Sequence, residues 1–119
     1  AEMVLSYSTS PAYHQISEDK NNYAAAAFTD GHYMQIEIAG ILKSSKNKGL
    51  SKKFLKFLTS NESQSIIPTT NWMYPVTKSN IPKEFLSLIK PNKNLLFSSQ
   101  VIQKEQKRWI NEWLKASSK

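Results

Sequence analysis

A tract of hydroxyl side chains near the start of the chain could hold a polar ligand. The tract comprises Tyr7, Ser8, Thr9 and Ser10. It joins a predicted strand to a predicted helix, and ligands of α/β proteins bind at such corners, outside the carboxyl ends of strands. The helix N-terminus adds free backbone N–H groups that suit a phosphate or a ligand hydroxyl. Tyr7 and Tyr13 flank the corner as possible flat walls; alternatively, Ser10 only caps the helix and the tyrosines pack.

A second candidate is an aromatic loop at residues 71–75, which contains Trp72. No periodic hydrophobic stripe explains this tryptophan, and its flat face suits a heteroaromatic or cationic ligand. The alternative is a core anchor for an irregular loop. Trp109 and Trp113 differ, because they follow the stripe of a predicted final helix and are expected in the core.

Catalytic and metal-binding patterns are nearly absent from the sequence. The chain has no cysteine, which excludes disulfides and thiolate ligands, and its three glycines exclude a phosphate loop of the P-loop type. His14 and His32 are the only histidines. We interpret His14 with Glu18 as a surface pair and His32 as structural, because neither has a ligand or nucleophile pattern around it. The sequence therefore predicts no enzyme, no metal site and no resident cofactor.

The charge is basic, with 16 Lys and Arg against 9 Asp and Glu, but Arg108 is the only arginine. Base recognition depends on the bidentate geometry of arginine, and the lysines are scattered. A solvated basic face is therefore favoured over a nucleic-acid footprint. A basic interaction module remains the most distant alternative, and it would bind with a steep salt dependence.

The elements indicate an α/β fold, with strands early and helices late. Strands are predicted at residues 3–7, 23–28 and 34–38, with a further extended piece at 94–97. Helices are predicted at residues 11–20, 49–59, 61–67, 82–90 and from 98 or 99 to 114. Expected caps are Ser10, Ser60 or Asn61, and Ser98 or Ser99. Because the first strand begins at once, we expect residues upstream of Ala1 and a chain cut inside a fold.

Three segments resemble the thiamine-binding periplasmic protein family. They are LSYSTSPAYH (5–14), NYAAAAFTDGHYMQIEIA (22–39) and IPTTNWMYPV (67–76). The likeness covers essentially all 119 residues, including the tryptophan pattern of the last helix.

This resemblance implies a type II periplasmic binding protein-like fold, of which residues 1–119 form the C-terminal part and the N-terminal lobe is absent. It implies a receptor that binds thiamine or its mono- and diphosphate in the periplasm and delivers them to an inner-membrane ABC permease. Tyr7, Ser8, Thr9 and Ser10 match positions around the thiamine or its phosphate, while Tyr13 and Trp72 match positions against its rings. We expect the missing lobe or another copy of the chain to cover the exposed apolar surface. The main alternative is a receptor of the same fold for another small cationic or phosphorylated solute.

Overall fold

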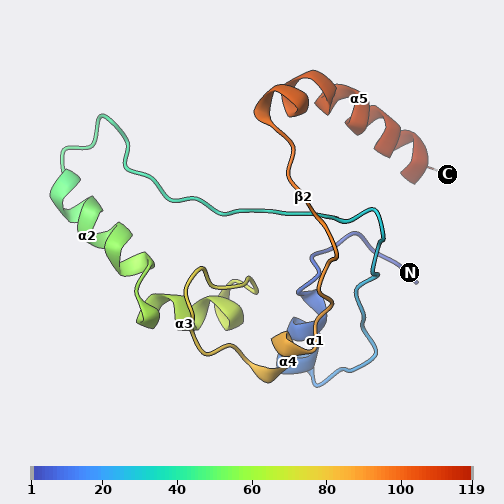
Figure 1. Ribbon diagram of the computed structural model, residues 1–119, viewed down its shortest axis with the longest axis horizontal. Helices are drawn as coiled ribbons and strands as arrows, with labels where there is room; N and C mark the ends of the chain where they lie inside the picture. Colours follow the sequence, from blue (N-terminus) through green and yellow to red (C-terminus); the bar gives the residue numbers. More distant parts are fainter. Residues whose placement is uncertain (1, 119) are drawn as a thin grey trace.

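A computed structural model describes residues 2–118, which form five helices and a two-stranded sheet (Figure 1). In chain order the elements are α1 (Ser10–Glu18), β1 (His32–Tyr33), α2 (Lys48–Leu58), α3 (Asn61–Thr70), α4 (Lys83–Leu86), β2 (Asn94–Leu95) and α5 (Ser99–Ser117). None of the helices in this part of the chain is both long and apolar enough to cross a membrane.

The best buried region lies where α1 packs on α4, at the lower end of the molecule in Figure 1. Ala12 of α1 is fully buried against Phe85 and Leu88, and Trp72 and Ile81 pack on this cluster. The small side chain of Ala12 allows the two helices to approach closely. This cluster supports the loop that carries Trp72.

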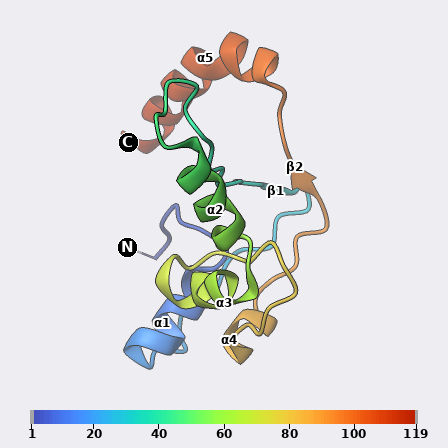
Figure 2. The same cartoon turned by 90° about the vertical axis from the view of Figure 1, so that its left-hand side faces the viewer.

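The sheet is a short parallel pair, visible side by side in Figure 2. His32 pairs with Asn94 and Tyr33 with Leu95, and the N–H of Met34 donates to the carbonyl of Leu95 at 2.9 Å. The preceding turn requires Gly31, whose φ is +108°. The extended piece predicted at 94–97 is thus confirmed as β2 in its first half.

Two predicted helices in the middle of the chain are confirmed as α2 and α3, which contact each other. Ser60 caps α3 by accepting a hydrogen bond from the N–H of Ser63 at 3.3 Å. The predicted end of α3 at Ile67 is wrong, because Pro68 lies inside the helix. Pro68 sits only two residues from the end, so that it removes a single helical hydrogen bond close to the terminus.

The predicted strands at 3–7, 23–28 and 34–38 are not strands in the described residues. A strand is defined by hydrogen bonds to a neighbour, and within the described residues the paired positions are His32 with Asn94 and Tyr33 with Leu95. Residues 34–42 instead form a long connection that crosses the molecule toward α2 (Figure 1). The alternating apolar residues of the predicted strand at 34–38 are exposed, so its predicted buried face is wrong as well.

The last two helices differ in length from the prediction. The helix predicted at 82–90 is a single turn, α4, whereas α5 extends to Ser117 and is capped by Ser98. Arg108 ties the outer face of α5 together by ion pairs to Glu105 and Glu112, at 2.7 and 2.8 Å.

The prediction that Trp109 and Trp113 are buried in a core is wrong, because α5 has no buried residue among those described. Trp113 is 55% exposed and Trp109 is half-buried against Phe97. The reason is position, because α5 lies apart from the helices of the α1–α4 region (Figure 1).

The molecule is open. Its radius of gyration is 17.9 Å, whereas a compact domain of this length has a value of about 13.5 Å. Large apolar side chains are exposed along 3–7, 34–42 and the apolar face of α2. Apolar surface of this extent is typical of an interaction surface.

Candidate functional site

A hollow of about 400 Å³ lies between the start of α1, the end of α3 and residue 37. Its lining residues are Ser6, Tyr7, Thr9, Ser10, Tyr13, His14, Glu37, Asn71, Trp72 and Met73. The hollow therefore brings together two segments that the sequence singled out independently, the hydroxyl tract and the aromatic loop.

The hydroxyl tract forms a turn that leads directly into α1. The N–H of Ser10 donates to the carbonyl of Tyr7, and the N–H of Ala12 donates to that of Thr9, both at 3.0 Å. Thr9, not Ser10, occupies the cap position, and its side chain makes no capping hydrogen bond. The prediction of Ser10 as the cap is thus wrong, because its hydroxyl instead lies 2.6 Å from the hydroxyl of Ser6.

This arrangement favours a polar or anionic ligand group at the helix start. The pair of hydroxyls at Ser6 and Ser10 offers both donors and acceptors, and it faces the same hollow as Thr9. The first turn of α1 contains no acidic residue that would compete for the helix N-terminus.

The aromatic wall consists of Tyr13 and Trp72. Their ring centroids are 5.0 Å apart and their planes are 83° apart, which is the edge-to-face geometry that aromatic pairs prefer. Both side chains line the hollow, and Trp72 also packs on the buried cluster around Phe85. The contacts of Trp72 therefore fit both interpretations of this residue, candidate ligand wall and core anchor.

The backbone of Trp72 is unusual. It follows the C-cap residue Asn71 of α3 and has φ +55°, a left-handed conformation that glycine normally provides at this position of a helix end. A tryptophan there costs roughly 1 kcal/mol or more of backbone strain. The strain holds the indole over the hollow, where a glycine would leave an open side.

Glu37, from the 34–42 connection, is an exposed residue that also lines the hollow. Its Oε2 accepts a hydrogen bond from Nδ2 of Asn71 at 2.9 Å, across 34 residues of sequence. This bond attaches the long 34–42 connection to the end of α3. Glu37 was missed as a site residue because it lies on the polar face of an alternating segment, which we expected to be solvated.

His14 borders the hollow and belongs to a small cluster on α1. Its Nδ1 lies 3.0 Å from Oε2 of Glu18, as expected for a surface pair, and its ring stacks on Tyr23 at a centroid distance of 3.8 Å. Hydrogen bonds from His14 and then from Lys20 hold the pKa of Glu18 below its usual range. His32, in contrast, accepts a hydrogen bond from the N–H of Phe28 at 3.2 Å, in agreement with a structural role.

The structure brings together five of the six predicted site residues. Tyr7, Thr9, Ser10, Tyr13 and Trp72 all line the hollow. Ser8 does not, although it lies in the same turn, because consecutive side chains of a tight turn point in different directions. Asn71 and Ser6 were quoted in the motifs without a role, and only their contacts reveal one.

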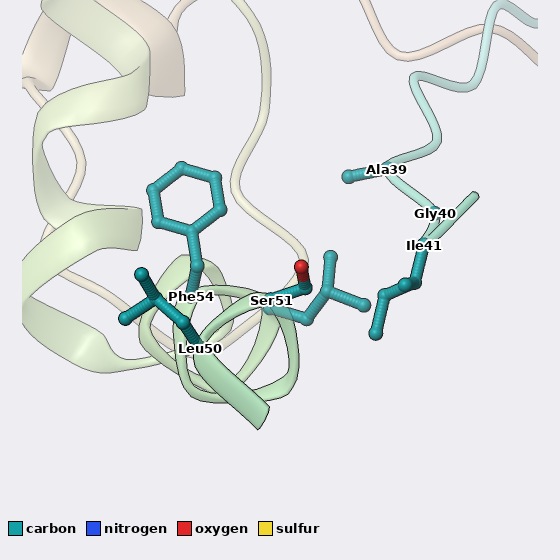
Figure 3. Close-up of a pocket in the computed structure, with 7 residues that line it drawn as sticks. Ala39, Gly40, Ile41, Leu50, Ser51 and Phe54 are labelled. Atoms are coloured by element: carbon teal, nitrogen blue, oxygen red, sulfur yellow. The ribbon is translucent and has the colours of Figure 1, made fainter. Parts of the chain in front are cut away.

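A second, slightly larger hollow of about 450 Å³ lies between the 39–41 segment and α2 (Figure 3). Phe54 and Leu50 project from α2 on one side, and Ala39 and Ile41 face them from the other. Ser51 is its one polar lining side chain, so it lacks the charged and hydrogen-bonding groups needed to recognise a charged ligand. The chemistry therefore favours the smaller hollow beside α1.

Candidate metal ligands do not form a cluster in residues 2–118. No group of three or more His, Asp or Glu side chains there is placed to hold a metal ion. Within the same range, no buried side-chain nitrogen or oxygen is left without a hydrogen-bond partner.

Similarity searches point to one group of proteins. A thiamine-binding periplasmic protein of Salmonella typhimurium is 50% identical over all 119 residues, and one of Escherichia coli is 46% identical. That of Haemophilus influenzae is 40% identical over 114 residues. A solved structure described as a periplasmic thiamin binding protein matches 96% of the chain with a TM-score of 0.82 and 46% identity. No protein-family model matches the chain.

The matched region is a minor part of those proteins. The chain spans 36% of the length of the Salmonella and Escherichia relatives, and 36% of the solved structure. That it corresponds to their C-terminal part remains a prediction. The resemblance and the binding-protein fold expected from the sequence are confirmed: along its whole length, this chain is similar to one part of the thiamine-binding periplasmic proteins.

Proposed function

We propose that this chain supplies one wall of the ligand site of a periplasmic receptor for thiamine and its mono- and diphosphate. The observation that carries the proposal is the hollow in which the hydroxyl turn of residues 6–10 faces the edge-to-face pair of Tyr13 and Trp72. The relatives named for thiamine binding and for the periplasm support the ligand and the location.

The chemistry of thiamine fits this hollow. Thiamine carries a flat pyrimidine and a cationic thiazolium ring, both of which bind well on aromatic faces. Its hydroxyethyl group, or the phosphate that replaces the hydroxyl proton, needs hydrogen-bond donors, which the side-chain hydroxyls of the turn provide. The positive end of the α1 dipole also favours a phosphate there. A single hollow thus satisfies both ends of the ligand.

The receptor binds its ligand without chemical conversion, needs no cofactor, and passes the ligand to an inner-membrane ABC permease. The remaining contacts come from residues outside this chain, since 36% of the relatives' length is matched here. A second lobe, or another copy of the chain, covers the apolar surface that α2 and the 34–42 connection expose.

The test is a calorimetric titration of thiamine into the complete gene product, alongside Trp72→Ala, Trp72→Phe and Trp113→Ala. Trp72→Ala should weaken binding by about 10- to 100-fold, because an aromatic face on a cationic ring contributes about 1–3 kcal/mol. Trp72→Phe should recover part of that loss. Trp113→Ala is the matched control, since it removes a half-exposed tryptophan of α5 that does not line the hollow.

Absence of heat with thiamine and both phosphates would overturn the thiamine assignment and leave a receptor for another cationic or phosphorylated solute. An equal loss in Trp113→Ala would show that Trp72 is not a specific contact.

A further inference from the structure

The hollow is lined by a negatively charged side chain although the chain as a whole is positively charged. The protein carries a net charge of +7 with sixteen basic residues, yet no lysine or arginine among the described residues 2–118 lines the hollow. Glu37 is the one carboxylate among its lining residues. In a basic protein this places a negative charge where the ligand would lie, next to a polarisable aromatic wall.

The position of Glu37 is held by a specific contact. Its Oε2 accepts from Nδ2 of Asn71, the residue directly before Trp72. Asn71 in turn caps α3, with its N–H donated to the carbonyl of Ile67 at 2.9 Å. The carboxylate is therefore fixed relative to the indole through two consecutive residues.

The other groups of the hollow leave the cation without a counter-ion. The hydroxyls of Ser6, Thr9 and Ser10 are neutral, and the first turn of α1 favours anions. A cationic ring bound against the Tyr13–Trp72 pair thus has Glu37 as its single negatively charged neighbour among the lining residues. The start of α1 suits the tail.

We infer that Glu37 is the specificity-determining residue that selects a cationic ligand over a neutral one of the same shape. The inference rests on the proposed function, and it names the group that distinguishes a cationic ligand from a neutral one. It also orients the ligand, because the cationic ring is drawn to Glu37 and the tail to the start of α1.

The substitution Glu37→Gln separates the effect of the carboxylate charge from the effect of its hydrogen bond with Asn71. The glutamine side chain has the same shape, and its Oε1 can still accept the hydrogen bond from Asn71. Glu112→Gln is the matched control, because it removes the same charge from the exposed face of α5, outside the hollow.

The experiment measures the affinities of the complete gene product for thiamine and for 3-deazathiamine, its neutral analogue in which a carbon replaces the thiazolium nitrogen. We expect Glu37→Gln to weaken thiamine binding by about tenfold, as for a charge pair near a protein surface, and to leave 3-deazathiamine binding within about twofold. Glu112→Gln should change neither affinity.

The outcomes separate this inference from the proposed function. A parent protein that binds neither thiamine nor its phosphates refutes the proposed function itself. A parent that binds thiamine, with Glu37→Gln unchanged, refutes only the role of Glu37. An equal loss for thiamine and 3-deazathiamine also refutes charge selection, because it assigns Glu37 a purely structural part in holding Asn71.

Discussion

Gln64 is the residue whose replacement most directly tests how the aromatic loop is held. Its side chain is almost fully buried, and its Nε2 donates to the carbonyl of Leu58 at 2.6 Å. Its Oε1 accepts from the N–H of Val76 at 2.7 Å. One amide thus connects the end of α2 to the loop that follows Trp72.

Gln64→Leu keeps the size of the side chain but removes both hydrogen bonds. Each bond contributes about 1 kcal/mol net, so the free energy of unfolding should fall by about 2 kcal/mol. The loss stays below the cost of two fully buried unsatisfied groups, because Val76 is exposed and water can reach its N–H. The free energy would be measured by urea unfolding of the complete gene product, followed by tryptophan fluorescence.

The control is Gln103→Leu, which makes the same chemical change at an exposed position of α5. It should alter the free energy of unfolding by no more than about 0.5 kcal/mol. If Gln64→Leu were as stable as the parent, the amide bridge would not support the loop. If both variants lost the same amount, the cause would be the added leucine and not the lost bridge.

Two further predictions concern the turn before β1 and Glu18, the last residue of α1. Gly31→Ala should destabilise the protein by more than about 1 kcal/mol, because its φ is +108° and the new Cβ would lie 2.7 Å from the carbonyl oxygen of Lys93. Gly49→Ala changes a helical position with nothing within 4 Å, so it should instead stabilise the protein by about 0.5 kcal/mol. Equal effects of the two variants in urea unfolding would refute the argument. Glu18 has a lowered pKa, chiefly through its hydrogen bond with His14, so its stabilising contribution exists above the unfolded value near 4.5 and is lost as the pH falls through the folded value. Glu18→Gln should therefore be less stable than the parent near neutral pH, with a difference that shrinks as the pH falls below the unfolded value near 4.5 and through the lower folded value; a difference that does not change with pH would contradict this assignment.

The helices could be predicted because their signals are local. The apolar stripe of α2 and the caps Ser60 and Ser98 lie within a few residues of the structure that they determine. The strands could not, because a strand depends on a neighbour that the local pattern does not identify. Residues 34–38 alternate as a strand does, yet the strand observed in this region is His32–Tyr33.

The candidate site was predicted as far as its two segments, and no further. The residue types in the hydroxyl tract and in the aromatic loop indicated ligand chemistry, and the structure brings Tyr13 within 5.0 Å of Trp72. Glu37 could not be identified in this way, because its place beside the hollow depends on a contact with Asn71, 34 residues away in the sequence. A carboxylate on a polar face is indistinguishable in sequence from a solvated one.

The best packed part of the chain lies next to the candidate site. In a molecule that exposes much of its apolar surface, the buried cluster of Ala12, Phe85 and Leu88 lies directly beneath Trp72. The strained backbone of Trp72 persists only if its surroundings hold it, and this cluster, together with the amide bridge of Gln64, provides that support. A preformed aromatic wall loses less conformational entropy when it binds a flat ligand. In the proposed receptor, the packing of α1 on α4 therefore contributes to recognition of the ligand, although neither Phe85 nor Leu88 lines the hollow.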